Sequence, residues 1–195
     1  MKEPAVAYNK RLYTVEEYLD LEHEAVEKSE YYQGEIFAMS GAKNQHNIVC
    51  MNVLANISLK LRGKPCRPYN SDMRVHIPQN TLFTYPDISV VCGEPEFYKN
   101  DEYNLLNPSV IIEVLSPSTR KYDMGRKFEL YKAIPTLQEY ILIDPGQVNI
   151  LSYCRNGMEW ERKEYSDITT VLIINVIKLR LKLTAVYEGT SVAML

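Results

Sequence analysis

Two carboxylates stand out because of where they occur in the chain. Glu113 is the only charged residue in the apolar run 110–115, and Asp87 follows a proline and opens a second apolar run, 88–91. A carboxylate that leaves water without a partner is strongly destabilised, so a buried Glu113 requires a cation or a hydrogen-bonding network. Carboxylates at the same end of two paired strands can bind a hard divalent cation through their oxygen atoms. The two residues are therefore candidates for a metal site.

A lysine on the next predicted element completes this set. Ser116-Pro117-Ser118-Thr119 is typical of a helix start, and Pro135 ends the helix near residue 134. In that helix Lys127 borders the apolar stripe that contains Phe128 and Tyr131. Its long side chain can reach back to the end of the strand that carries Glu113.

Each residue also has an ordinary structural explanation, and the residues alone leave these alternatives open. If 110–115 formed an edge strand, Glu113 would face water. Pro-Asp dipeptides such as Pro86-Asp87 are common in turns. Lys127 would then be a solvated lysine whose aliphatic stem covers apolar surface.

The elements that must position these residues alternate between helices and strands. Thr14 and Glu17 form a capping box for a helix from 15 to about 26. Apolar residues at helical spacing, Ile48, Met51 and Leu54 with an extension to Ile57 and Leu61, predict a second helix over 44–61. Gln33-Gly34 predicts a hairpin turn between 30–32 and 35–39. Further strands are expected over 71–77, 87–91, 110–115, 139–143, 149–154, 160–165, 170–174 and 177–183.

The strand–helix–strand unit 110–143 predicts a parallel strand pair joined by a right-handed crossover. Predicted hairpins flank this unit on both sides. The pattern therefore predicts an α/β fold with a mixed central sheet flanked by helices and extra antiparallel strands at both ends. With 195 residues and no linker, we expect a single domain over 1–195.

Composition excludes several classes of protein. The chain is 46% hydrophobic and 24% charged, with a net charge of −3, so it has no global positive field for a polyanion. Local basic segments exist: residues 118–134 hold five bases and two acids, and the bases of 177–183 share one strand face. No apolar run is long enough to span a bilayer, and the N-terminal segment has no apolar stretch of signal-peptide length.

We expect the cysteines and histidines to have structural roles rather than to bind a metal. The four cysteines are far apart in sequence with no CxxC pair, so we expect free thiols in a reducing cytoplasm rather than disulfides or a zinc site. His76 alternates with Val75 and Ile77, and we expect it to face solvent. His46 lies on the second predicted helix, where we expect a hydrogen-bonding role rather than metal ligation.

These motifs together resemble those of a known family. Pro86-Asp87, the block Ile112-Glu113-Val114-Leu115-Ser116-Pro117-Ser118-Thr119 and the downstream Asp123, Lys127 and Tyr131 are similar to the Uma-type restriction endonuclease family. That family belongs to the PD-(D/E)XK nuclease superfamily. The resemblance extends over about residues 14–187 and implies a restriction endonuclease-like core with a metal site at one end of the sheet.

The resemblance assigns roles to four residues. It makes Asp87 and Glu113 the ligands of Mg²⁺ or Mn²⁺. The superfamily lysine usually stands two residues after the glutamate, where this chain has Leu115, so Lys127 from the following helix is the residue that fits. Glu35 on the early hairpin resembles an additional catalytic carboxylate that precedes the core in several such nucleases.

The activity implied by the resemblance is metal-dependent hydrolysis of DNA phosphodiester bonds. The alternative is a DNA-binding module that keeps the fold without catalysis, and a second is an enzyme that uses the same site on another phosphoester. We expect DNA as the partner, no membrane association, a cytoplasmic location, and a homodimer because cutting both strands often takes two sites. No cofactor-binding residues besides the metal ligands are predicted.

Overall fold

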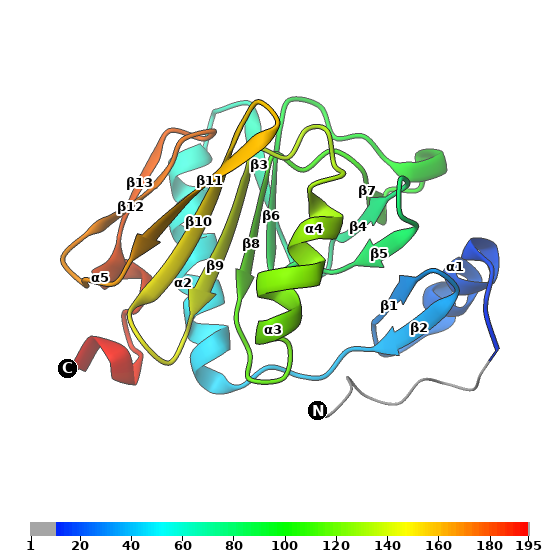
Figure 1. The fold of residues 1–195 in the computed structure, drawn as a ribbon, viewed down its shortest axis with the longest axis horizontal. Coiled ribbons are helices and arrows are strands. Elements are labelled where there is room, and N and C mark those ends of the chain that lie inside the picture. The colour runs from blue at the N-terminus through cyan, green and yellow to red at the C-terminus, as the bar shows by residue number, and fades with distance from the viewer. Residues whose placement is uncertain (1–10, 195) are drawn as a thin grey trace.

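The computed structural model describes residues 11–194 and is built around a six-stranded mixed sheet of order β11-β10-β9-β8-β6-β3. Helix α2 covers one face of this sheet, and the helical segment from α3 to α4 covers the other (Figure 1). A second, five-stranded sheet of order β2-β1-β5-β4-β7 lies beside it with helix α1. The predicted α/β architecture with mixed sheets flanked by helices is confirmed.

Most of the predicted elements are present and occur in the predicted order. The helical elements are α1 (Val15–Glu24), α2 (Asn44–Leu61), η1 (Tyr98–Asn100), α3 (Arg120–Tyr122), η2 (Asp123–Lys127), α4 (Phe128–Tyr131), α5 (Leu183–Val186) and η3 (Ser191–Met194). The strands are β1 (Ser29–Tyr32), β2 (Glu35–Ala38), β3 (Cys66–Asn70), β4 (Arg74–Ile77), β5 (Leu82–Thr84), β6 (Ile88–Cys92), β7 (Asn104–Leu105), β8 (Val110–Val114), β9 (Glu139–Asp144), β10 (Asn149–Asn156), β11 (Glu159–Tyr165), β12 (Val171–Ile174) and β13 (Leu179–Lys182).

Strand β8 is a central strand, which excludes the edge-strand alternative for Glu113. It pairs antiparallel with β6 and parallel with β9, so both of its edges are hydrogen-bonded. Because side chains alternate along a strand, Val110, Ile112 and Val114 pack in the core on the α2 side. Ile111 packs on the opposite side with Phe128 and Tyr131 of α4. The parallel β8–β9 pair confirms the predicted crossover unit.

The helical segment after β8 is less regular than predicted. One continuous helix was expected up to residue 134, whereas the structure has a short α3, a π-helical turn η2 and a short α4. Within η2, Asp123 and Lys127 are buried while the three residues between them are exposed. π-Helical turns are frequent at functional sites because they change which side chains face inward. Here the turn directs two charged side chains toward the sheet.

The N-terminal hairpin and its preceding helix form as predicted. Thr14 Oγ1 accepts a hydrogen bond from the Glu17 amide and Glu17 Oε2 accepts one from the Thr14 amide, which completes the capping box. Gln33 and Gly34 have φ values of 49° and 92°, as a two-residue hairpin turn requires. The turn sets the register Tyr31↔Ile36 and so places Glu30 opposite Phe37.

Two expectations about burial are wrong. His76 is 3% exposed rather than solvent-facing, because β4 lies between β5 and β7 and the imidazole stacks on Phe83 at 3.8 Å. Burial lowers the pKa of His76 to about 4. On α2 the buried stripe consists of Val49, Val53, Ile57 and Leu61. Ile57 and Leu61 belong to the predicted series, whereas Met51 is 62% exposed. Both sets of residues repeat with the period of a helix, so spacing alone did not decide which set faces the core.

The structure also contradicts the expectation of free thiols for half of the cysteines. Strand β3, which the sequence analysis did not predict, places Cys66 opposite Cys92 of β6, and the two form a disulfide. Cys50 and Cys154 are free. Strands β5 and β7 were also not predicted. The expectation of a reducing compartment rested on four free thiols, so the disulfide removes that argument.

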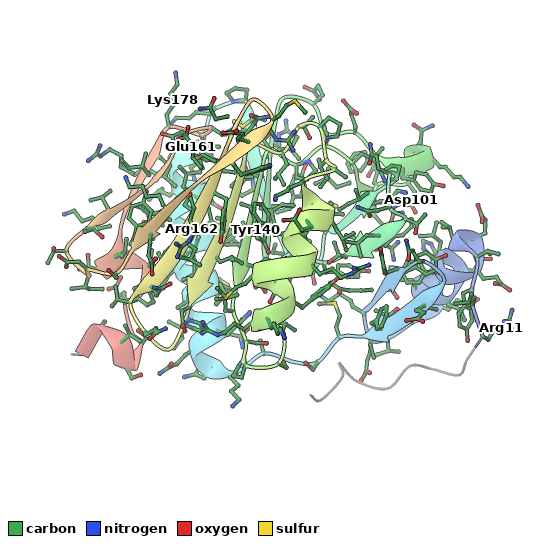
Figure 2. All side chains as sticks on the ribbon, in the orientation of Figure 1. Arg11, Asp101, Tyr140, Glu161, Arg162 and Lys178 are labelled. Carbon is green, nitrogen blue, oxygen red and sulfur yellow. A yellow bond between two sulfur atoms is a disulfide. The ribbon has the colours of Figure 1, made fainter. Side chains whose placement is uncertain are left out.

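The rest of the chain supplies the outer parts of the fold. Strand β13 alternates buried leucines with exposed Arg180 and Lys182, as predicted. In Figure 2, Lys178 projects from the periphery of the molecule while Tyr140 lies in its interior. Within residues 11–194, no helix has the length and apolar character that crossing a membrane would require. The expectation that no signal peptide is present rests largely on residues 1–10, outside the described residues.

Candidate active site

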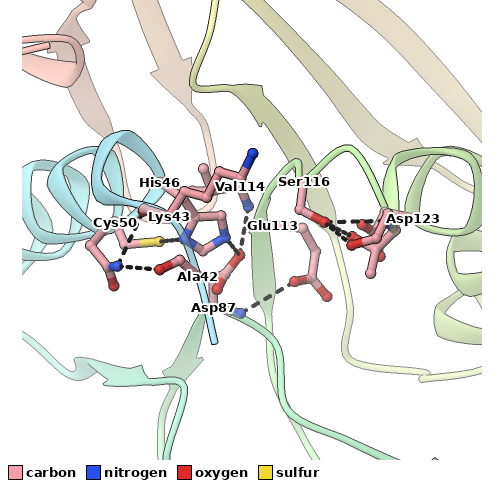
Figure 3. Close-up of polar contacts among 12 residues, drawn as sticks. Ala42, Lys43, His46, Cys50, Asp87, Glu113, Val114, Ser116 and Asp123 are labelled. Carbon is pink, nitrogen blue, oxygen red and sulfur yellow. Dashed lines mark hydrogen bonds and ion pairs between the residues drawn. The ribbon is translucent and has the colours of Figure 1, made fainter. Parts of the chain in front are cut away.

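The two predicted carboxylates lie next to each other at the ends of adjacent strands. Asp87 precedes β6, and Glu113 is the penultimate residue of β8. The amide of Val114 donates a hydrogen bond to Asp87 Oδ2 at 2.7 Å, and the amide of Asp87 donates one to Glu113 Oε2 at 3.3 Å. Each carboxylate is therefore held by the main chain of the other strand, and Figure 3 shows them side by side.

Glu113 is enclosed on the face of the sheet that α4 and η2 cover. Its side chain is 6% exposed, and its Oε1 atom accepts a hydrogen bond from the hydroxyl of Tyr131 at 3.0 Å. The ammonium of Lys127 lies 2.9 Å from the same oxygen. Direct or water-bridged contact requires a separation of no more than about 5 Å. The observed distance is well within this limit, which confirms that Lys127 reaches Glu113.

Lys127 is surrounded by carboxylates from three different elements. Besides Glu113, its Nζ atom lies 3.5 Å from Glu30 Oε1 of β1 and 3.8 Å from Asp123 Oδ1 of η2. The lysine side chain is only 7% exposed, so these contacts are weakly screened by water. One ammonium cannot neutralise three carboxylates. An excess of negative charge therefore remains that a proton or a cation can neutralise.

The protonation behaviour of the cluster follows from this imbalance. Burial raises the pKa of Glu113 to about 8, against the opposing effect of Lys127. Burial also raises the pKa of Asp123. Burial alone lowers the pKa of Lys127, but the carboxylates of Glu113 and Glu30 outweigh it and hold that pKa well above its ordinary value. At neutral pH the lysine is charged, and burial favours the protonated form of Glu113.

Asp87 has a different environment from Glu113. Its side chain is 18% exposed, and its Oδ2 atom lies 3.2 Å from His46 Nε2 of α2. Burial lowers the pKa of His46, but the hydrogen bond to Asp87 outweighs that effect and raises it overall. The hydrogen bond expected of His46 is thus present. The contacts from His46 and from the Val114 amide are both made to Oδ2.

The fourth predicted residue is not brought into the cluster. Glu35 is exposed at the start of β2, and no hydrogen bond or ion pair within 11–194 joins it to Asp87, Glu113 or Lys127. The hairpin instead contributes Glu30, whose Oε1 atom accepts a hydrogen bond from the Thr84 hydroxyl and lies next to Lys127. Sequence reasoning missed Glu30. The available signal was its place directly before Tyr31 in a predicted strand. Tyr31 packs in the core with Tyr18 and Phe83, and neighbouring residues of a strand face opposite sides, so Glu30 faces away from that cluster.

The donor set of the pair fits a hard divalent cation. Asp87 and Glu113 offer carboxylate oxygens, which are the ligands that Mg²⁺ and Mn²⁺ prefer. They lie where negative charge exceeds positive charge, and Asp87 is partly open to solvent. These residues would hold the cation, and Lys127 would remain beside it on the buried side.

Some basic residues of the adjacent helical segment are paired with carboxylates, and others are exposed. Arg120 pairs with Asp144, Lys132 pairs with Glu129, and Lys127 is buried in the cluster. Lys121 and Arg126 are exposed. Arg126 donates a hydrogen bond to the hydroxyl of Tyr32 at 3.0 Å. The positive surface next to the site is therefore smaller than the count of bases suggested.

Comparisons with known proteins agree with this geometry. The chain matches the family Uma2, described as "Putative restriction endonuclease", over residues 15–185. It is 40% identical to the uncharacterized protein sll1609 of Synechocystis over 75% of this chain and 83% of that protein. It is 35% identical to the uncharacterized protein slr1290 of the same organism, over 90% of this chain and 92% of that protein.

A solved structure has the same fold. It is the crystal structure of a "putative nuclease belonging to DUF820" from Anabaena variabilis, with a TM-score of 0.74 and 21% sequence identity. The match covers 90% of this chain and 98% of that chain. At this level of identity the likeness establishes the shared fold.

Proposed function

The chain belongs to the Uma2 family, and on that premise we propose that it is a divalent-metal-dependent endonuclease that hydrolyses DNA phosphodiester bonds. The observation that supports this proposal most directly is the cluster of Asp87, Glu113 and Lys127 at the ends of β6 and β8. Two carboxylates and one ammonium at a strand end are the groups that phosphodiester hydrolysis needs. The assignment of Glu30 to this site replaces Glu35 in the proposal.

Phosphodiester hydrolysis must overcome the repulsion between an anionic phosphate and the attacking oxygen. Asp87 and Glu113 would hold a divalent cation, which would supply positive charge for the phosphate and lower the pKa of bound water. Asp87 is held by the Val114 amide, which donates to its Oδ2 atom, and its side chain is 18% exposed. Glu113 must give up its proton to act as a ligand, because only the carboxylate form binds the cation.

Lys127 and Tyr131 act on the buried side of the same carboxylate. The ammonium at 2.9 Å and the phenol at 3.0 Å both hold Glu113 Oε1, so Oε2 points toward Asp87. Lys127 also supplies the positive charge that offsets charge developing on the phosphate during attack. Glu30 and Asp123 anchor the lysine from its other side. No covalent intermediate is needed, since water supplies the attacking oxygen.

Exposed bases on two elements are the proposed DNA contacts. Lys121 and Arg126 lie on the segment that also carries Lys127, and both are exposed. Arg180 and Lys182 on β13 form a second exposed basic stretch. Contacts of this kind with phosphates weaken as salt concentration rises. We therefore expect DNA affinity to fall steeply with salt.

The test is cleavage of supercoiled plasmid with Mg²⁺, with Mn²⁺ and with a chelator. We expect nicked or linear product only with metal, and none from Asp87→Asn. Equal cleavage by wild type and Asp87→Asn would contradict the proposal. Metal-independent binding to DNA without any cleavage would instead favour the catalytically inactive DNA-binding module.

The inactive module is the second candidate, and one observation favours it. Lys127 is enclosed by three carboxylates and is 7% exposed, so its ammonium is less accessible to a phosphate than a surface lysine would be. The homodimer and the cytoplasmic location remain predictions. Sedimentation of the protein with and without a DNA duplex tests the first of these.

A further inference from the structure

A second group of metal-binding atoms lies on the other side of Asp87. His46 and Cys50 are four residues apart on α2, so their side chains project from the same face of the helix. His46 Nε2 lies 3.2 Å from Asp87 Oδ2, and His46 Nδ1 lies 3.5 Å from Cys50 Sγ. One ligand atom from each of the three residues can be chosen so that all lie within 4.8 Å of one another.

The chemistry of this group differs from that of the proposed catalytic site. It offers one imidazole nitrogen, one sulfur and one carboxylate oxygen, whereas Asp87 and Glu113 offer oxygen alone. Thiolate and imidazole ligands select zinc and similar transition metals over magnesium. Three protein ligands with one open position form a common arrangement for zinc.

The surroundings are compatible with entry of an ion. The His46 side chain is 13% exposed and that of Asp87 18%, so the site is neither sealed nor fully solvated. Cys50 is not part of the disulfide. Figure 3 shows His46 and Cys50 on the α2 side of Asp87, with Glu113 on the opposite side.

We propose that His46, Cys50 and Asp87 form a site for zinc or a similar transition metal, and that its occupation competes with the catalytic cation for Asp87. The competition rests on the proposed nuclease function, whereas zinc binding does not. Because Asp87 belongs to both groups, two dications at these sites would share one carboxylate and repel each other at short range. Zinc at this site would therefore act as an inhibitor of metal-dependent cleavage.

The first measurement is zinc affinity, by competition with a chromophoric chelator, on protein kept without reductant under inert gas. We expect one zinc ion bound per chain. Cys50→Ser should weaken binding by at least about 100-fold, since even changes outside the ligand shell cost about 10–100-fold. Cys154→Ser is the matched control, because Cys154 is the other free cysteine and contacts Glu139 instead. It should bind zinc as the wild type does.

His46→Gln and cobalt substitution keep the test decisive if Cys50→Ser folds poorly. His46→Gln should weaken zinc binding to a similar degree. Cobalt bound to the wild type should give a thiolate-to-metal charge-transfer band that Cys154→Ser keeps and Cys50→Ser loses. Absence of zinc binding, or zinc affinity that is unchanged in Cys50→Ser, would overturn the site.

Competition is measured by electron paramagnetic resonance of bound Mn²⁺. Zinc should release Mn²⁺ from the wild type at about 100-fold lower concentration than from Cys50→Ser, in line with the affinity ratio. If zinc binds through Cys50 but the protein neither binds Mn²⁺ nor cleaves DNA, the zinc site stands and the nuclease proposal fails. If DNA is cleaved while zinc affinity is independent of Cys50, the nuclease stands and the zinc site fails.

Discussion

The ammonium of Lys127 and the carboxylate of Glu113 lie 2.9 Å apart, and their side chains are only 7% and 6% exposed. The two residues come from η2 and from the central strand β8, which are separated in sequence by the loop 115–119 and the short helix α3. A buried pair of this kind is costly to break, because the remaining charge is left without a partner. The contact therefore couples the helical segment to the end of the sheet where Asp87 lies.

Replacing Lys127 should remove DNA cleavage while DNA affinity changes little. Lys127→Ala deletes the charge beside Glu113, whereas one lost phosphate contact changes binding only modestly. Cleavage of labelled duplex and a gel-shift titration measure the two effects separately. Lys121→Ala and Lys132→Ala are the controls, because Lys121 is exposed and Lys132 pairs with Glu129. Loss of activity in either control but not in Lys127→Ala would show the assignment to be wrong.

The same substitution should also lower stability. Above about pH 8, where Glu113 is ionised, removing its buried partner typically costs about 3–5 kcal/mol. Lys127→Met keeps most of the aliphatic stem and should unfold at a lower urea concentration than wild type. Unchanged unfolding would mean that the pair contributes nothing to the folded state.

Metal binding should strengthen as pH rises toward 8. Burial raises the pKa of Glu113 to about 8, so below that pH the cation must displace a proton from the carboxyl. Mn²⁺ affinity should therefore increase up to about tenfold per pH unit below 8 and level off above it. Carbon-13 NMR of the Glu113 carboxyl follows the proton directly, and saturating Mg²⁺ should lower its pKa. A metal affinity that is flat between pH 6 and 8 would contradict this assignment.

Without metal, the free energy of unfolding should fall as pH rises, whereas metal affinity rises. The pKa of Glu113 is about 8 in the folded chain against an ordinary value of 4.5, so the folded state binds more protons between these limits. The contribution of Glu113 to the free energy of unfolding is complete below pH 4.5 and is lost as pH rises toward 8. Urea unfolding across this range should show the decline, and Glu113→Gln should reduce its slope.

Glu30 and Glu35 offer a matched pair on one hairpin. Glu30→Gln removes a carboxylate 3.5 Å from Lys127 Nζ and should reduce cleavage by about tenfold or more, since it repositions the lysine. Glu35→Gln changes an exposed side chain and should leave cleavage close to wild type. The reverse pattern would restore the original expectation for Glu35. Melting temperatures of both variants show whether lost activity reflects lost folding.

The Cys66–Cys92 disulfide can be tested by counting reactive thiols. Denatured, unreduced protein should contain two reactive thiols, from Cys50 and Cys154, and reduced protein should contain four. Closing a loop of 26 residues stabilises a fold by about 3 kcal/mol in the chain-entropy treatment. The double variant Cys66→Ser/Cys92→Ser should therefore unfold at lower denaturant concentration. Four reactive thiols without reductant would contradict the bridge.

The sequence by itself determined the elements whose signals are local. The capping box at Thr14 and Glu17, the Gln33-Gly34 turn and the apolar run around Glu113 each depend on residues within a few positions of one another. The crossover from β8 to β9 followed from the same run and the helix after it. Family motifs then placed Asp87, Glu113 and Lys127 in one site, and the structure brings these three together.

Only the tertiary structure decided which side chains from distant segments meet. Strand pairing put Cys66 opposite Cys92 and enclosed His76 between two neighbouring strands. The π-helical turn and the seating of the hairpin brought Glu30, rather than Glu35, to Lys127. Periodicity specifies that a residue lies on one face of its element, but not what covers that face. That outcome depends on register and packing between segments far apart in the chain.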